Sequence, residues 1–218
     1  MTSCCSGYCD IADRQFSEKL AARELKRYQQ KGPGPTTRLL RDCIVAAGAA
    51  RGHMLDVGGG VGALSFELLD RGVAEATIVD ASSAYTAAAQ REARALARAR
   101  AMHIVHADFL AAADSLPTVE IVALDRVVCC YPSYEPLLSE AMRHSSRYVA
   151  LSYPRDLWHV RSVVGIENLA RRFSGNPFRS FVHRASAMAE LAARHGFTLR
   201  CRKHTIAWQV DLLERTGG

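Results

Sequence analysis

The stretch Leu55–Gly62 constrains the fold of this chain more than any other part of its sequence. It joins the end of an apolar run, an aspartate and four glycines within five positions to a helix-forming segment that starts near Ala63. Glycine lets the backbone turn sharply and approach a ligand with no Cβ in the way. A helix that follows such a turn directs its free N–H groups and its positive dipole end at that ligand. The stretch therefore predicts a strand, a tight turn and a helix, with a ligand beyond the carboxyl end of the strand.

Short apolar runs alternate with helix-forming segments along the rest of the chain. Strands are expected at residues 53–57, 76–80, 102–106, 119–124, 147–153, 198–202 and 206–212. Helices are expected at residues 11–30, from Thr36 or Thr37 as the capping residue, and at 63–70, 83–100, 135–143, 157–173 and 185–195. This alternation predicts an α/β fold with a doubly wound, mostly parallel seven-stranded sheet and helices on both faces.

Composition narrows the class of protein. The chain has 218 residues, of which 49% are hydrophobic, enough for one sizeable domain with its own core. The net charge is +6, but the arginines are scattered and do not interleave with aromatic residues, which argues against a nucleic-acid partner. No apolar run has the length of a membrane span, and no secretory signal is evident. We therefore expect a cytoplasmic protein with no membrane partner, and the charge is compatible with an acidic small-molecule substrate.

One aspartate stands at the predicted carboxyl end of each of four successive strands. These residues are Asp56, Asp80, Asp108 and Asp125. A single strand-end aspartate is ordinary turn chemistry. Four in register, one of them beside a glycine turn, indicate a binding site. Asp80 follows the glycines by about 20 residues, the spacing at which an acid can reach ribose hydroxyls.

The string from Asp56 to Gly62 reads D-x-G-x-G-x-G and resembles motif I of class I S-adenosylmethionine (SAM) methyltransferases. The resemblance is strong from about Leu55 to Tyr153. It implies SAM as the cofactor and a SAM-binding methyltransferase domain over residues 36–218. Helices before the first strand often cover the cofactor in that family, so residues 1–35 are expected to form an N-terminal segment and a cap helix.

The resemblance also implies roles for single residues. In this family's pattern the backbone of the glycine loop packs on the methionine part of SAM, Asp56 serves its ammonium, and Asp80 takes the ribose hydroxyls. The adenine would be contacted by Ala81, Ser82, Asp108 and Phe109. The implied cofactor-binding set is Asp56, Gly58, Gly60, Gly62, Asp80, Ala81, Ser82, Asp108, Phe109, Asp125 and Arg126. Asp125 and Arg126 would supply backbone contacts beneath the sulfonium; alternatively, Asp125 forms an ion pair with Arg126 or another arginine.

The methyl acceptor is expected over the ends of the fourth and fifth strands. Residues there are Tyr131, Tyr153, Arg155, Trp158 and His159. We expect Tyr131, Arg155 and His159 to be catalytic, because an aromatic wall, a guanidinium and a near-neutral base would suit a carboxylate or phenol. Trp158 and His159 could instead pack on the sheet. The helical segment after the fifth strand and Trp208 loosely resemble magnesium-protoporphyrin O-methyltransferases, so we predict methyl transfer to the oxygen of a small molecule.

Other interpretations stay open. Seven cysteines, an odd number without a secretory signal, argue against a disulfide framework. Cys129 and Cys130, with Cys4, Cys5 and Cys9 as a lid, would suit a metalloid or thiol methyltransferase, although free cysteines are commonly small buried hydrophobes. A structural metal site is not expected. An NAD-dependent oxidoreductase would leave Asp56 and Asp108 unexplained, and a non-catalytic SAM-binding protein would lack an acceptor pocket. A homodimer is compatible with the sequence.

Overall fold

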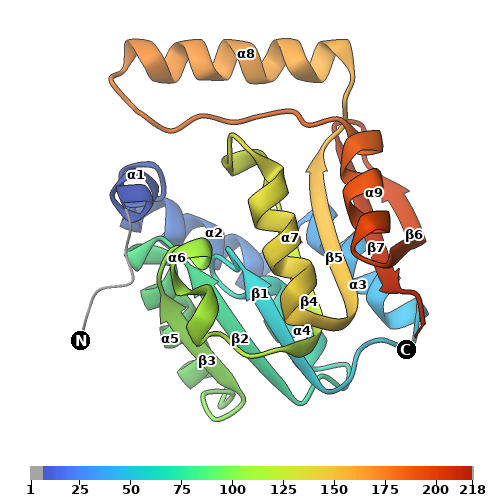
Figure 1. Cartoon of the computed structure of the whole chain (residues 1–218). Coiled ribbons are helices and arrows are strands. Elements are labelled where there is room, and N and C mark those ends of the chain that lie inside the picture. The colour runs from blue at the N-terminus through green and yellow to red at the C-terminus, as the bar shows by residue number, and fades with distance from the viewer. Residues whose placement is uncertain (1–6, 218) are drawn as a thin grey trace.

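The computed structural model describes residues 7–217 and has a single seven-stranded sheet at its centre (Figure 1). The strands are β1 (His53–Val57), β2 (Glu75–Asp80), β3 (Met102–His106), β4 (Val119–Asp125), β5 (Ser145–Pro154), β6 (Phe197–His204) and β7 (Trp208–Arg215). Their order is β3-β2-β1-β4-β5-β7-β6. The first five strands pair in parallel, and β7 pairs antiparallel to both β5 and β6. The predicted mostly parallel sheet is confirmed.

Helices cover both faces of this sheet. They are α1 (Gly7–Gln15), α2 (Glu18–Lys31), α3 (Pro35–Ala46), α4 (Ala63–Leu69), α5 (Ser83–Ala95), α6 (Phe109–Ala112), α7 (Tyr134–His144), α8 (Trp158–Phe173) and α9 (Ala185–Arg194). Because strand side chains alternate, Met54 of β1 joins the core with α3, α4 and α5, while Leu55 joins the core with α6, α7 and α9. Asp56 has the parity of Met54, so its side chain points toward α3 and α4.

The N-terminal helix predicted over residues 11–30 is two helices. α1 ends at Gln15 and α2 begins at Glu18, with Ser17 in an extended conformation between them. The physical reason lies in Phe16, whose ring packs against Tyr85 and Phe178 and whose carbonyl accepts a hydrogen bond from Ser82 Oγ. These long-range contacts stabilise the interruption between α1 and α2. The division of the chain at residue 35 into a cap and a domain stays a prediction.

The expectation that Thr36 or Thr37 caps the second predicted helix, α3, is wrong. Neither Thr36 nor Thr37 caps this helix, because Pro35 is its first residue and Gly34 occupies the capping position. Both threonines are instead buried within the first turn. Thr37 Oγ1 donates a hydrogen bond to Asp125 Oδ2 at 2.5 Å, across 88 residues of sequence. α3 therefore supports the carboxyl end of β4.

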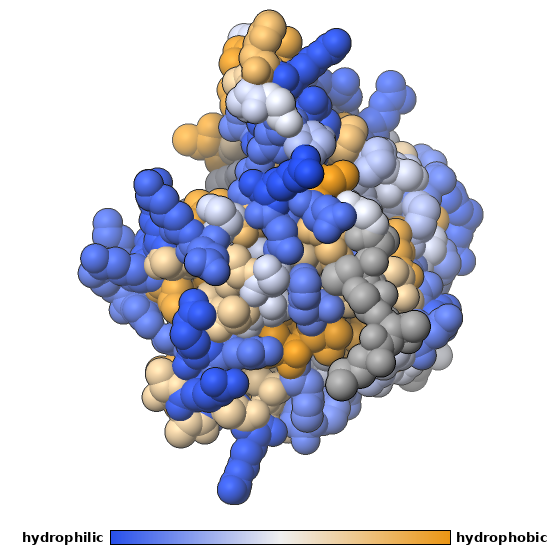
Figure 2. Space-filling model, turned by 90° about the vertical axis from the view of Figure 1, so that its left-hand side faces the viewer, coloured by the Kyte–Doolittle hydropathy of each residue, from blue (hydrophilic) through white to orange (hydrophobic). Residues whose placement is uncertain are grey.

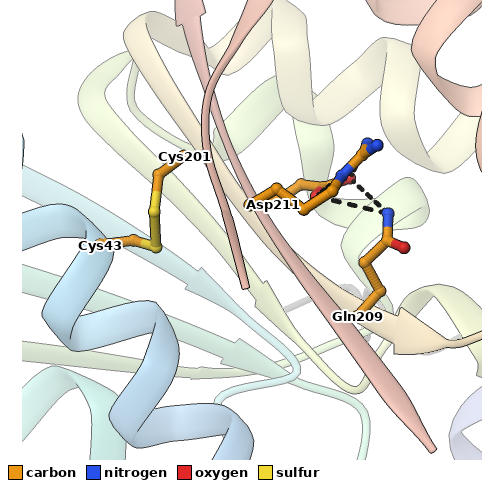
Figure 3. The surroundings of a disulfide bond; sticks show 5 residues. Cys43, Cys201, Gln209 and Asp211 are labelled. Atoms are coloured by element: carbon orange, nitrogen blue, oxygen red, sulfur yellow. Dashed lines mark hydrogen bonds and ion pairs between the residues drawn. A yellow bond between two sulfur atoms is a disulfide. The ribbon is translucent and has the colours of Figure 1, made fainter. Parts of the chain in front are cut away.

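A disulfide between Cys43 of α3 and Cys201 of β6 is the third difference (Figure 3). The sequence argued against disulfides because the cysteine count is odd. The topology explains the pairing: after β5 and two further helices the chain enters β6 at the edge of the sheet, and this places Cys201 against the helix that carries Cys43. The two residues are 158 positions apart, so spacing along the sequence gave no signal.

Candidate active site

The glycine loop leaves β1 in left-handed backbone conformations. Gly58 has φ 60°, Gly60 φ 58° and Gly62 φ 85°. A Cβ on Gly58 would lie 2.6 Å from Val127 Cγ2, and one on Gly62 would lie 2.9 Å from the Phe66 ring. At Gly60 the nearest atom would be 3.9 Å away, on Tyr85. Gly58 and Gly62 are thus required by packing, whereas Gly60 faces open space.

That open space is a cavity of about 310 Å³ at the carboxyl ends of the strands. From the strand ends it is lined by Val57, Gly58, Gly60, Val79, Asp80, Ala81, Asp125, Arg126 and Val127. α1 and α8 lie above this edge of the sheet (Figure 1). They and the loop after α8 contribute side chains that include Tyr8, Phe16, Arg171 and Phe178. The cavity therefore occupies the ligand crevice of an open α/β sheet.

Asp80 is fixed at the floor of this cavity. Its carboxylate accepts hydrogen bonds from the N–H of Gly60 and the N–H of Ser82, both at 2.8 Å. The side chain is buried, and burial raises the pKa of Asp80 to about 6, although the two N–H donors oppose that change. A carboxylate held in this way keeps lone pairs for two hydroxyl donors, which fits a ribose.

Asp56 leaves one of its oxygens without a partner. Oδ2 accepts a hydrogen bond from Ser65 Oγ at 2.7 Å, whereas the buried Oδ1 has no hydrogen-bond partner within residues 7–217. Burial raises the pKa of Asp56 to about 7, and the charges of Asp125 and Asp80 act in the same direction. The residue lines a smaller cavity of about 50 Å³ that also borders Gly58 and Gly60. An unpartnered carboxylate oxygen beside the loop fits the ammonium of SAM.

Asp125 does not form the ion pair that was the alternative expectation. Its two oxygens accept hydrogen bonds from Thr37 Oγ1 at 2.5 Å and Ser152 Oγ at 2.6 Å, and no ion pair with an arginine occurs among the described residues. The N–H of Arg126 donates to Ser152 Oγ at 2.8 Å and fixes this residue at φ 63°. Arg126 can then extend along the cavity wall.

Tyr131 lines the cavity next to Asp108, the residue that precedes α6. Its hydroxyl donates to Asp108 Oδ1 at 2.8 Å, and its ring stacks on Tyr8 with centroids 4.9 Å apart. Burial, with the neighbouring Tyr8 and Asp108, raises the pKa of Tyr131 far above its ordinary value. Phe109 also lines the cavity, beside Asp108. The hydroxyl of Tyr131 is therefore engaged in holding Asp108, and a catalytic role of Tyr131 stays a prediction.

The structure places the four other residues of the expected acceptor site away from the cavity. The hydroxyl of Tyr153 donates to the buried Asp211, and the guanidinium of Arg155 donates to the carbonyls of Thr205 and Ile206. Trp158 is 80% exposed and His159 is exposed, so neither packs on the sheet. None of these four residues lines the cavity formed by the described part of the chain. The reason is that α8 starts directly after β5 and turns its first residues toward solvent.

Some implied cofactor contacts also lie outside the main cavity. Ser82 is buried and caps α5, since its Oγ accepts a hydrogen bond from the N–H of Tyr85. Gly62 packs against Phe66 at the start of α4. No local sequence pattern identified the remaining lining residues, because helices and a loop remote from the glycine motif bring them to the cavity; they include Tyr8, Phe16, Tyr85, Arg171 and Phe178. The amphipathic N-terminal segment pointed only to a cover of some kind.

Two adjacent thiols lie at the cavity wall. Cys129 and Cys130 belong to a single short turn (Val128–Cys130), their Sγ atoms are 3.9 Å apart, and Cys130 lines the cavity. Both thiols donate to the carbonyl of Arg126. Cys9 is buried in α1, and the predicted lid residues Cys4 and Cys5 lie outside the described residues. Within residues 7–217, no group of three or more His, Cys, Asp and Glu side chains is placed to hold a metal ion.

Ligand affinity is expected to fall with decreasing pH. The free protein protonates Asp56 near pH 7 and Asp80 near pH 6, whereas an ammonium and two hydroxyl donors need both carboxylates charged. Binding should therefore release one proton between about pH 7 and 6 and two protons below pH 6, so affinity should decrease by about tenfold per pH unit in the first range and by up to about a hundredfold per pH unit in the second. Calorimetry with S-adenosylhomocysteine (SAH) between pH 8 and 5.5, in buffers of different ionisation heat, measures this. Asp56→Asn should flatten the profile between pH 7 and 6; an affinity independent of pH would contradict these assignments.

Known proteins share both the domain and the fold. Residues 54–148 match the family model described as a methyltransferase domain. The magnesium protoporphyrin IX methyltransferase from Synechocystis PCC 6803, solved with bound SAH, has a TM-score of 0.68 at 19% identity over 97% of this chain and 95% of its own. An O-methyltransferase family protein from Burkholderia thailandensis has a TM-score of 0.75 at 14% identity, over 96% and 62% of the two chains. No curated protein matches the sequence.

A third structure extends the comparison. The O-methyltransferase family 2 protein from Planctomyces limnophilus DSM 3776, in complex with apigenin, has a TM-score of 0.60 at 14% identity over 75% of this chain and 50% of its own. With the domain match over residues 54–148, the strand order and the glycine loop beside Asp56 and Asp80, the chain carries a methyltransferase domain, and its fold is that of the class I SAM-dependent methyltransferases. Within this class its fold resembles that of magnesium protoporphyrin methyltransferase.

Proposed function

We propose that the protein transfers the methyl group of SAM to an oxygen atom of a small, flat, anionic acceptor. One observation carries this proposal: a second cavity of about 260 Å³ adjoins the cofactor cavity and shares Glu24, Arg126 and Trp208 with it. Arg27 also lines the second cavity. Two guanidiniums and an indole suit an aromatic carboxylate, which would be held by charge and by its flat face.

The cofactor would lie along the glycine loop. Asp56 would hold the ammonium, Asp80 the ribose, and Phe109 with Asp108 the adenine. SAM supplies an already activated methyl group, so the protein has to align the acceptor and exclude water. A carboxylate acceptor arrives with a charged oxygen, so no general base is required. Structural relatives named as O-methyltransferases, one of them in complex with apigenin, support oxygen and a flat acceptor.

Arg126→Gln tests the acceptor site. The variant keeps the backbone that borders the cofactor and removes the guanidinium, so kcat/KM for an aromatic carboxylate should fall at least about tenfold. The affinity for SAH should stay within about twofold. SAH formation is measured with aromatic carboxylates and their amides, with Arg38→Gln, an exposed arginine of α3, as the matched control. Equal activity of Arg126→Gln and wild type on all active acceptors would place the acceptor elsewhere.

A second candidate acceptor follows from the thiol pair. Cys130 lines the cavity, the Sγ atom of the buried Cys129 lies 3.9 Å from that of Cys130, and thiolates bind soft metalloids. The acceptor panel should therefore include arsenite and small thiols. Methylation of arsenite that is lost in Cys130→Ser, with no turnover of any oxygen acceptor, would favour this candidate over the first.

A further inference from the structure

Helix α8 exposes an unusually apolar face. Of its residues Trp158 is 80% exposed, Ile166 68% and Phe173 83%, and Val163 and Leu169 are more than half exposed. At 3.6 residues per turn these five side chains fall within one arc of the helix. α8 stands apart from the sheet at the top of Figure 1, and hydrophobic atoms gather at the top of Figure 2. Val160 is the one α8 residue that is fully buried.

The opposite face of α8 contacts the rest of the protein. Glu167 and Arg171 line the cofactor cavity and pair with each other at 3.2 Å. Asn168 exchanges two hydrogen bonds with the backbone of Ser180, and the Arg171 guanidinium lies over the Phe178 ring. These contacts fix which face points outward. The apolar arc is therefore a projecting ridge on the solvent side of the cavity cover.

The ridge lies in a cationic part of the chain. Residues 155–184 contain six arginines and two acidic residues, a net charge of +4 out of +6 for the whole chain. Both acids are engaged, Asp156 with Arg161 and Glu167 with Arg171. Arg172, which falls on the flank of the apolar arc, has no ion-pair partner among the described residues. The surface that covers this ridge must accept apolar side chains and be negatively charged.

A second copy of the chain does not meet that requirement. Ile166 is near the middle of α8, so two copies packed antiparallel would bring Arg161 of one helix next to Arg172 of the other. Four arginines would then face each other with no additional acid. An anionic lipid surface supplies both the apolar layer and the negative charge. Trp158 and Phe173 at the two ends are residue types that favour the membrane interface.

We propose that α8 docks the protein on an anionic lipid surface, with Trp158, Ile166, Leu169 and Phe173 inserted between the lipids and the arginines at the headgroups. This differs from spanning the membrane: within residues 7–217 no helix is long and apolar enough to cross a bilayer. This proposal departs from the expectation, drawn from the sequence, of no membrane partner. The proposal does not depend on which acceptor is methylated.

Vesicle sedimentation tests the proposal with the full chain. The protein should bind vesicles of phosphatidylcholine mixed with phosphatidylglycerol, bind phosphatidylcholine alone more weakly, and lose affinity as salt is added. Binding should shift the fluorescence of Trp158 to shorter wavelength. Ile166→Glu should weaken binding about tenfold to a hundredfold, because one buried side chain is lost from the lipid and a negative charge is added.

Leu96→Glu is the matched control. Leu96 is 46% exposed at the end of α5, on the far side of the molecule from α8, so this variant should bind vesicles like wild type. Both variants should retain SAH affinity, which shows that they are folded. Vesicle binding that Ile166→Glu leaves unchanged would overturn the proposal. A second result would also overturn it: the wild-type protein does not bind vesicles, light scattering shows that it is a dimer, and Ile166→Glu dissociates this dimer. A second copy of the chain would then cover the ridge.

Discussion

Replacing Gly60 with leucine is expected to abolish cofactor binding while leaving the protein folded. A Cβ at this position meets nothing closer than 3.9 Å, because the space beside it is the cavity itself. A leucine side chain would fill the space that the methionine part of SAM needs next to the loop. The affinity for SAH should fall at least about a thousandfold, equivalent to about 4 kcal/mol.

Backbone strain is the competing explanation, because Gly60 has φ 58° and a side chain in this region costs roughly 1–2 kcal/mol. Gly48→Leu separates the two effects. Gly48 has φ 65° with open space around its Cβ position, and it lies after α3, away from the cavity. Both variants should show a similar loss in thermal stability, whereas calorimetry should detect SAH binding only for Gly48→Leu. SAH binding to Gly60→Leu at near wild-type affinity would show that the cofactor does not pass along this loop.

The second large effect is expected at Asp80. Asp80→Ala should weaken SAH binding by about 1.5–3 kcal/mol, the range for hydrogen bonds to a charged group, which corresponds to roughly ten- to 150-fold. The carboxylate also accepts from the N–H groups of Gly60 and Ser82, so its removal loosens the loop as well. Asp80→Asn keeps the shape and one acceptor oxygen. It should fall between Asp80→Ala and wild type.

Ser82→Ala is the control for loop integrity. Ser82 Oγ caps α5 and donates to the carbonyl of Phe16, but it does not line the cavity. This variant should lower stability by about 1 kcal/mol, the typical cost of a lost helix cap, with little change in SAH affinity. If Asp80→Ala bound SAH like wild type, Asp80 would be a turn residue and not the ribose ligand.

The strands and their order of appearance were predictable because short apolar runs and a period of two are local properties of the sequence. β1 and β3 are found as expected, and the other strands differ only at their ends. The glycine loop was predictable for the same reason, since a motif of seven residues carries both the turn and the adjacent acid. The predictions were wrong where contacts between segments distant in the sequence determine the local structure. Phe16 breaks a helix by packing on Tyr85 and Phe178, and no local pattern contains that contact.

The acceptor side was the least predictable part of the site. Position at a strand end suggested Arg155 and His159, but the direction in which α8 leaves β5 decides where these side chains point. Arg155 is used to hold the carbonyls of Thr205 and Ile206, and Tyr131 is used to hold Asp108. Trp208 reaches the cavity because the antiparallel β7 returns beside β5, and Arg126 reaches it because its N–H is held by Ser152 of β5. Only the three-dimensional arrangement supplies that information.

The most direct measurement is the crystal structure of the protein with bound SAH. The ribose hydroxyls should contact the carboxylate of Asp80, the adenine should lie beside Phe109, and the amino group should approach Asp56 Oδ1. The sulfur atom should then face the second cavity, next to Arg126 and Trp208. SAH bound outside the cavity, or bound with its adenine and amino acid ends exchanged, would contradict this assignment of the site.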